Sequence, residues 1–352
     1  MNTNLAWQEK IAQLRTQKRV RILALESSCD ETAAAIVENG RTVLGECIFS
    51  QVDKHALYGG VVPEIASRAH VDACDRVIDN ALAQANLTLA DIDALAVTYG
   101  PGLVGALLTG VNCMKGLAFT TGLPLIPVNH IQGHVCANFL ADLTLEPPFL
   151  CLVVSGGHSH IIRVNDYHDF SLVGQTVDDA VGEAFDKAAR ILGLPYPGGP
   201  LLSELAKQGN DTAIPLPTPK VEGKYNFSFS GMKTAFINLC HKYTQKDIPL
   251  PKADLAASFE KKVVDILCEK TLLALKDSGL STLCLAGGVS ANRVLRSRMQ
   301  ELSEKENFSL CMPELQYCTD NATMIASAAY YCMLDEKVAT LSLNAVPALR
   351  FV

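Results

Sequence analysis

Two stretches of the chain repeat the same order of elements, and this repeat limits the possible folds more than any other feature. Each stretch begins with a hairpin of two apolar strands and continues, further on, with an apolar strand that runs into a glycine loop and a helix. Alternating strands and helices indicate an α/β architecture, and the repeat predicts two duplicated lobes with a cleft between them. The predicted hairpins are 21–26 with 32–37 and 149–154 with 159–164, and the later strands are 94–98 and 282–286.

The length supports this division, because 352 residues are more than one hydrophobic core usually serves. Residues 1–20 should form an N-terminal extension with a short helix. The first lobe should span 21–140, with 325–352 packing back on it. The second lobe should span 141–324, and its proline-rich insertion 205–260 is expected to be irregular.

The composition excludes several classes of protein. With 49% hydrophobic and 19% charged residues the chain is not disordered, and its net charge of −7 argues against a general nucleic-acid coat protein. No run reaches the roughly 18 apolar residues of a membrane span. Twelve cysteines without a Cys-x-x-Cys pair favour reduced thiols and a cytoplasmic protein. The first residues lack the apolar core of a secretion signal, and a mitochondrial presequence is the alternative.

Two histidines give the strongest chemical signal. His130 and His134 lie four residues apart behind Asn129, a good helix cap, so both imidazoles can share one helical face and one metal ion. A helix N-terminus also favours the neutral rings that metals bind. The alternative is a helix with two partly exposed polar residues. Asp320 is the best-placed carboxylate to complete a His–His–Asp set for Fe(II) or Zn(II), or it caps the helix that follows it.

Three glycine loops after apolar strands favour a nucleotide or phosphate ligand. Glycines allow backbone N–H groups to approach an oxyanion, as does a helix N-terminus. For the loop between the strands of the second hairpin, an ordinary turn is the alternative, and no Walker loop occurs. The loops lie at 99–103, 154–158 and 285–292.

A predicted helix at 178–192 carries a polar stripe formed by Asp179, Glu183, Asp186 and Arg190. The stripe fits a solvated face. Because the glycine loop 197–200 follows this helix, the stripe also fits a cleft wall with an acid that accepts from ribose hydroxyls.

Together these motifs resemble those of the tRNA threonylcarbamoyladenosine synthase family, most closely its bacterial TsaD-type branch. They occur in family order from residue 22 to about 330. The extension before them is longer than is usual in the family. The matching segments are Leu25–Thr32, Tyr58–His70, Gly100–Leu108, His130–His134, Ser155–His158, Asp178–Lys187, Pro197–Leu202, Phe227–Ala235, Ala286–Arg293 and Tyr317–Asn321.

The resemblance implies the fold shared by actin, heat-shock chaperone ATPases and sugar kinases (the ASKHA fold), with two RNase H-like lobes. It implies transfer of threonylcarbamoyl from threonylcarbamoyl-AMP to N6 of adenosine 37 in tRNAs that read ANN codons, with release of AMP. One divalent metal ion, Fe2+ or alternatively Zn2+, would be bound by His130, His134 and Asp320. By position, the adenylate contacts would be Val153, Val154, Ser155, Gly156, Gly157, Asp186, Gly199 and Asn292, and Asp30 and Glu31 match acids linked to nucleotide handling or partner coupling.

The resemblance also implies partners. The tRNA anticodon loop must dock, a bacterial assembly would add a TsaB-like paralogue and a TsaE-like ATPase, and an organellar version would be a homodimer; no membrane is involved. The alternative to RNA contact for the basic residues of this region is a solvated surface. The candidate contacts to the RNA backbone are Lys187, Arg190, Lys220, Lys224, Tyr225 and Lys233.

Three other classes of protein compete with this interpretation. A zinc peptidase needs His-Glu-x-x-His, and here Ile131 stands in the place of the glutamate. A small-molecule kinase or ATPase of the same fold holds Mg2+ through carboxylates and water and has no need of two histidines. A silent scaffold subunit would lack the metal ligands, whereas this chain keeps all three candidates.

Overall fold

The computed structural model describes residues 3–351 and divides the chain into two compact units. Unit 1 comprises Met1–Glu146 and Pro313–Val352, and unit 2 comprises Pro147–Met312. The predicted N-terminal extension contains helix α1 (Thr3–Leu14), whose Trp7 packs in the core of unit 1, while residues 1–2 lie outside the described part. Within residues 3–351, no helix has both the length and the apolar character that crossing a bilayer requires.

Unit 1 is built on a five-stranded sheet with the strand order β3-β2-β1-β4-β5. Strand β1 pairs antiparallel with β2 and parallel with β4, which in turn pairs parallel with β5. The strands are β1 (Arg21–Glu26), β2 (Glu31–Glu38), β3 (Thr42–Ser50), β4 (Ala94–Gly100) and β5 (Leu125–Asn129).

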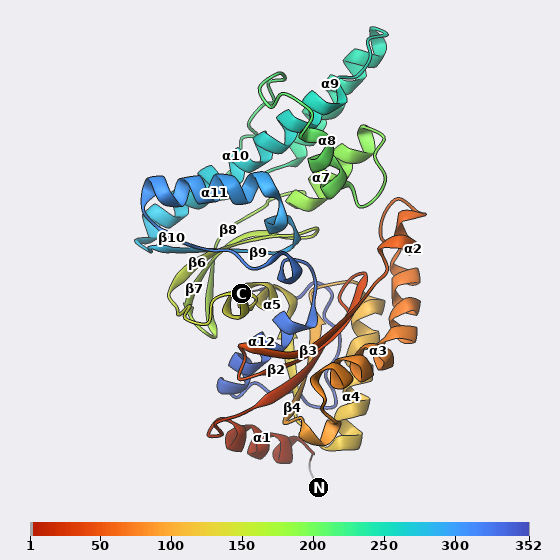
Figure 1. Ribbon diagram of the computed structural model, residues 1–352, viewed down its shortest axis with the longest axis vertical. Helices are drawn as coiled ribbons and strands as arrows, with labels where there is room; N and C mark the ends of the chain where they lie inside the picture. The colour runs from red at the N-terminus through yellow and green to blue at the C-terminus, as the bar shows by residue number, and fades with distance from the viewer. Residues whose placement is uncertain (1–2, 352) are drawn as a thin grey trace. The chain divides into compact units, whose positions relative to one another are not determined.

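Alternation along β2 decides which helices cover each face of this sheet. Ala34 and Ile36 belong to the core formed with α3 (Pro63–Ala85) and α4 (Val104–Thr121), whereas Ala33 and Ala35 meet Ala322 of α12 (Ala322–Leu334). The small alanines let α12 pack closely on its face. Figure 1 shows α3 and α4 on one side of the sheet and α12 on the other. The remaining short elements of unit 1 are α2 (Val52–Ala56), η1 (Leu89–Asp91), α5 (His130–Cys136), α6 (Asn138–Ala141) and η3 (Leu315–Tyr317).

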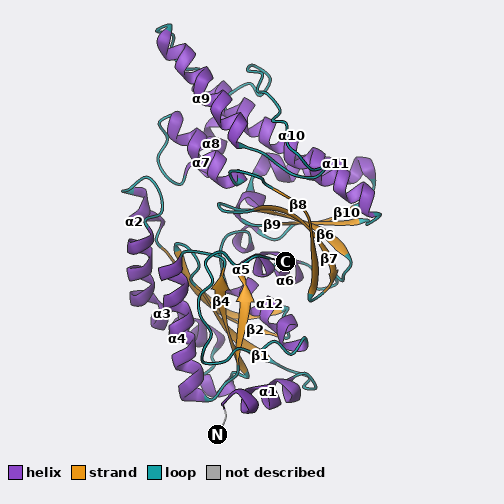
Figure 2. Cartoon of the chain, turned by 180° about the vertical axis from the view of Figure 1, so that it is seen from behind, coloured by secondary structure: helices purple, strands orange, loops and turns teal. Residues whose placement is uncertain are grey.

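Unit 2 repeats the topology of unit 1. Its sheet has the order β10-β9-β6-β7-β8, with β6 antiparallel to β7 and parallel to β9. Both sheets thus place a hairpin strand beside two later parallel strands, as the sequence repeat predicts. Figure 2 shows the helices of unit 2 gathered on one side of this sheet. The elements are β6 (Phe149–Val154), β7 (Ser159–Asp166), β8 (Asp169–Gln175), α7 (Val181–Ile191), α8 (Gly198–Ala206), α9 (Ser230–Gln245), α10 (Lys252–Ser278), β9 (Thr282–Ala286), η2 (Gly288–Ala291), α11 (Arg293–Glu306) and β10 (Ser309–Cys311).

Two predictions about unit 2 need correction. The helix expected from residue 178 begins only at Val181, because the Asp178 carboxylate accepts hydrogen bonds from the backbone N–H groups of Phe229 and Ser230 and so stays in a loop. The segment 205–260, expected to be irregular, contains α9. The buried residues of α9 are Met232, Phe236 and Cys240, a four-residue spacing that is the signal for this helix.

Candidate metal centre and glycine-loop site

The two histidines lie on a short helix directly after β5. The side chain of Asn129 accepts a hydrogen bond from the Ile131 N–H, at 2.9 Å, and so caps α5 as predicted. Every residue of α5 is buried, and the centroids of the His130 and His134 rings are 4.7 Å apart. The alternative of two partly exposed polar residues is therefore wrong.

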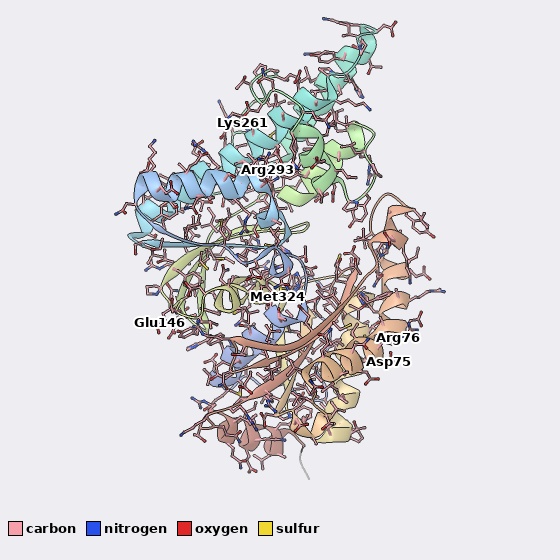
Figure 3. The ribbon with its side chains drawn as sticks, viewed as in Figure 1. Asp75, Arg76, Glu146, Lys261, Arg293 and Met324 are labelled. Atoms are coloured by element: carbon pink, nitrogen blue, oxygen red, sulfur yellow. The ribbon has the colours of Figure 1, made fainter. Side chains whose placement is uncertain are left out.

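Asp320 lies close to both rings. Its Oδ1 is 3.4 Å from His130 Nε2 and 3.2 Å from His134 Nε2, and the three ligand atoms lie within 4.8 Å of one another. Asp320 does not cap α12, because the side chain of Asn321 does so by accepting from the Met324 N–H. The structure places Asp320 in unit 1 with the histidines, whereas the predicted boundary at residue 324 assigned it to the second lobe. Met324, on α12, is labelled in Figure 3.

His134 tests whether this group fits a metal ion. The residue is completely buried, yet within residues 3–351 neither of its ring nitrogens makes a hydrogen bond, although Asp320 Oδ1 lies 3.2 Å from Nε2. A buried imidazole nitrogen without a partner is costly. A divalent cation would provide a partner for the Nε2 atom of His134. Two histidines with one carboxylate are a donor set that binds Fe2+ and Zn2+ and leaves coordination positions open. The residues therefore fit a metal ion.

The charges around His130 favour its protonated form when no ion is bound. Burial lowers the pKa of His130, but the carboxylates of Asp320 and Glu26 outweigh burial and raise this pKa well above its ordinary value. Burial raises the pKa of Asp320, and His130 and His134 reverse the shift and hold it well below the usual range. The sequence argument from the helix N-terminus predicted a neutral ring. It fails because two carboxylates flank a helix of only seven residues.

We expect metal affinity and the stability of the metal-free protein to respond oppositely to pH. The imidazolium of His130 stabilises the metal-free fold fully below its ordinary pKa of 6.5, and this contribution is lost as pH rises through the raised pKa. Metal binding must displace that proton, so affinity should fall by up to about tenfold per unit as pH decreases below the raised pKa. Zn2+ titrations and urea unfolding of the metal-free protein at several pH values measure the two trends. Affinity independent of pH would contradict this assignment.

Replacing Asn321 by alanine should destabilise α12 and displace Asp320. The Asn321 side chain is fully buried, accepts from the Met324 N–H at 2.9 Å and donates to the Thr319 carbonyl at 2.7 Å. Losing an N-cap costs about 1–2 kcal/mol of unfolding free energy, which urea denaturation measures. The exposed Asn344, whose side chain accepts from the neighbouring Ala345 N–H, provides the control Asn344→Ala. Equal unfolding midpoints for the two variants would count against the cap.

Glu26 is a residue of the metal region that the sequence analysis missed. It ends β1, is fully buried, and its Oε2 lies 3.1 Å from His130 Nδ1. A carboxylate at the end of an otherwise apolar buried strand is a signal that could have identified it, because such side chains are rarely buried without a partner.

Asp30 is the last residue of the turn from β1 to β2, and Glu31 is the first residue of β2. Burial, the neighbouring Asp30 and the charge of Asp320 raise the pKa of Glu31 to about 9, so its carboxyl group is protonated at neutral pH. His70, from the Tyr58–His70 motif, holds this turn: its Nδ1 is 2.8 Å from Thr32 Oγ1, and its Nε2 donates to the Cys29 carbonyl. The structure thus gives His70 a role in fixing the two acids.

In unit 2 the predicted glycine loop follows β6. Val153 and Val154 are buried strand residues, and the Ser155 N–H donates to the His158 carbonyl at 2.8 Å. The N-terminus of α7 packs on the loop so closely that a Cβ at Gly182 would lie 2.7 Å from the Ser155 carbonyl oxygen. By contrast, Cβ atoms at Gly156 and Gly157 would meet no atom within 4 Å among residues 3–351, apart from the adjoining residues of the chain. The loop is fixed on its α7 side and open above its two glycines.

Asp186 and Asn292 are engaged with neighbouring elements of unit 2. Asp186 Oδ1 accepts from the N–H groups of Gly198 and Gly199, at 2.9 and 3.1 Å, and so caps α8. Asn292 caps α11 through its Oδ1, and its Nδ2 donates to Ser203 Oγ and to the buried Glu260. Sequence reasoning missed Glu260. These contacts join α7 to the start of α8, and the start of α11 to α8 and α10.

The basic residues proposed for RNA contact are partly paired within unit 2. Lys187 and Lys233 both bind Asp179, at 3.1 and 2.6 Å, and Lys224 binds Asp277 at 2.6 Å. The Tyr225 hydroxyl also donates to Asp277. RNA phosphates would therefore compete with the carboxylates of the same unit for these basic side chains. The contact with RNA stays a prediction.

Comparison with known proteins agrees with this geometry. The model of the TsaD family, described as tRNA N6-adenosine threonylcarbamoyltransferase, matches residues 42–327. Proteins of that name from Clostridium botulinum (strain Kyoto / Type A2) and Clostridium perfringens (strain ATCC 13124) are 50% and 52% identical, covering 95% and 94% of the chain and 98% and 97% of the relatives.

Solved structures show the fold alone, because their sequences are distant. HypF from T. kodakarensis matches with a TM-score of 0.62 and 13% identity, over 90% of this chain and 48% of that one. (R)-2-Hydroxyglutaryl-CoA dehydratase component A from Acidaminococcus fermentans matches with a TM-score of 0.53 and 15% identity, over 90% and 99% of the chains. Both are ASKHA-type folds, so the predicted fold class is confirmed.

Proposed function

Since the chain belongs to the TsaD family of tRNA N6-adenosine threonylcarbamoyltransferases, we propose that its donor is threonylcarbamoyl-AMP and that the reaction releases AMP. The enzyme transfers a threonylcarbamoyl group to adenosine in tRNA, and the position we propose is N6 of adenosine 37 in tRNAs that read ANN codons. The N6 amine forms a bond to the carbamoyl carbon, the bond from that carbon to the phosphate oxygen breaks, and the amine loses a proton. The family assignment argues against the peptidase and kinase alternatives.

The observation that carries the proposal is the group of His130, His134 and Asp320, in which both histidines are buried and Asp320 is half-buried. An exocyclic adenine amine is a poor nucleophile, so the carbonyl it attacks must be made electrophilic. A divalent ion held by these three residues, which we propose to be Fe2+ or alternatively Zn2+, would supply Lewis-acid polarisation. The buried Nε2 of His134, which makes no hydrogen bond within residues 3–351 and lies 3.2 Å from Asp320 Oδ1, supports this assignment.

We assign the adenylate to the glycine loop of unit 2. The open face above Gly156 and Gly157 leaves room for a phosphate near backbone amides, which would stabilise the charge of the leaving AMP. Val153, Val154 and Ser155 anchor this loop. Asp186 holds the first turn of α8 through the N–H of Gly199, and Asn292 holds the first turn of α11. No covalent enzyme intermediate is required.

The assembly we propose contains further partners. The net charge of −7 and the internal pairing of Lys187, Lys224 and Lys233 support a TsaB-like paralogue and a TsaE-like ATPase that supply part of the affinity for the anticodon loop. The bacterial relatives and the tRNA substrate support action in the cytoplasm.

Nucleoside mass spectrometry tests this function. Unmodified tRNA that reads ANN codons is incubated with the protein, the proposed partners and threonylcarbamoyl-AMP. We expect threonylcarbamoyladenosine in the tRNA and an equal amount of AMP, and neither with a tRNA that has guanosine at position 37. Modified tRNA without AMP would refute the donor, and unmodified tRNA would refute the proposed reaction.

A further inference from the structure

Glu26 is fixed in place before any metal ion binds. Its Oε1 accepts the backbone N–H of Ser28, and its Oε2 accepts the Thr98 hydroxyl at 2.6 Å. The same Oε2 lies 3.1 Å from His130 Nδ1. Glu26 and His130 are both buried, so water does not compete for these contacts.

From these contacts we propose that Glu26 is a positioning residue that selects the tautomer of His130 able to bind the metal ion. The inference rests on the metal centre of the proposed function. A carboxylate only accepts hydrogen bonds, so it requires a proton on Nδ1 and leaves the lone pair of the neutral ring on Nε2. Nε2 is the atom that faces Asp320, at 3.4 Å. A carboxylate behind a histidine ligand also raises the basicity of the ligand.

A second group near Nδ1 makes this selection necessary. Ser28 Oγ lies 3.2 Å from His130 Nδ1, and a hydroxyl can either donate or accept. If Ser28 donated to Nδ1, the ring proton would move to Nε2 and block the metal side. Glu26 removes this choice. Within residues 3–351 the second ligand, His134, has no hydrogen-bond partner on its Nδ1, so His130 is the ligand whose tautomer is set in advance.

The variant Glu26→Gln reverses the selection with almost no change of shape. The Ser28 backbone N–H can only donate, so the amide oxygen should turn toward it. The amide NH2 then faces His130 Nδ1 and donates to it, which places the ring proton on Nε2. We expect Co2+ and Zn2+ to bind about 10- to 100-fold more weakly, and the visible absorption of bound Co2+ to change.

Two further variants separate positioning from general stability. Ser28→Ala removes the competing hydroxyl but keeps the backbone N–H, so metal affinity should stay the same or increase. Glu38→Gln replaces another glutamate of unit 1, paired with Arg21 at 3.0 Å, and should leave metal binding unchanged. Thermal unfolding of each metal-free variant reports whether it is folded.

The outcomes distinguish this inference from the proposed function. Weaker binding in Glu26→Gln with unchanged binding in Ser28→Ala supports the inference. Equal affinity of Glu26→Gln and the unaltered protein overturns it and leaves the metal centre standing. A tenfold loss in Ser28→Ala also overturns it, even where Glu26→Gln does not fold, because the hydroxyl would then set the ring. An unaltered protein that binds neither ion refutes the metal centre itself.

Discussion

Replacing Asp320 by asparagine is expected to lower the rate of tRNA modification by about 100-fold or more. The substitution keeps the shape of the side chain but removes the charge that lies 3.4 and 3.2 Å from the two histidine Nε2 atoms. A bound metal ion contributes several kcal/mol to stabilising charge in a transition state, and each 1.4 kcal/mol corresponds to about tenfold in rate. Nucleoside mass spectrometry of the tRNA and elemental analysis of the protein measure modification and metal content together.

The control for this variant is Asp142→Asn in the same unit. The Asp142 carboxylate accepts from the N–H and the hydroxyl of Thr144 rather than facing the histidine rings as Asp320 does. It should leave both readouts unchanged. If Asp320→Asn loses the metal ion but modifies tRNA at the normal rate, the ion has no part in the chemistry. If Asp320→Asn keeps both the metal ion and the normal rate of tRNA modification, Asp320 is not a ligand.

The sequence was sufficient where the signal is local. Strands β1, β6 and β9 have the predicted ends, because each is an apolar run bounded by polar, proline or glycine residues. The spacing of His130 and His134 and the cap at Asn129 needed only one helical turn of context. Asp320 is 186 residues beyond His134, and there the family resemblance supplied what spacing alone left open between ligand and cap.

The residues that were missed depend on pairing between distant strands. Glu26 reaches His130 because β1, β4 and β5 lie side by side, a register that no local pattern specifies. Glu260 reaches Asn292 for a similar reason, since α10 and the start of α11 meet only in the folded unit. The sequence analysis placed Asp320 beside His130 but missed Glu26, and the two carboxylates together outweigh the expected effect of the helix N-terminus on the pKa of His130.

The substitution Gly157→Ala, which adds a Cβ atom, is expected to weaken AMP binding by about 5- to 150-fold without destabilising the protein. Neither Gly156 nor Gly157 has a positive φ, and in the described part of the chain the added carbon would meet no atom within 4 Å beyond the adjoining residues. Gly157→Ala should therefore leave the unfolding free energy unchanged or raise it by about 0.4–1 kcal/mol, through the unfolded state. A ligand phosphate close to the loop would be displaced, and steric crowding of this kind costs about 1–3 kcal/mol.

Gly182→Ala is the matched variant, because it crowds the same loop from the protein side. Its Cβ would lie 2.7 Å from the Ser155 carbonyl oxygen and 2.8 Å from the Gly156 Cα, so the start of α7 or the loop must move. We expect a loss of about 1–3 kcal/mol in unfolding free energy, together with weaker AMP binding. Calorimetric titration with AMP measures ligand affinity and urea denaturation measures stability, and together they distinguish Gly157→Ala from Gly182→Ala. Normal AMP affinity in Gly157→Ala would mean that the phosphate does not approach this loop, because a phosphate held there would meet the added methyl group.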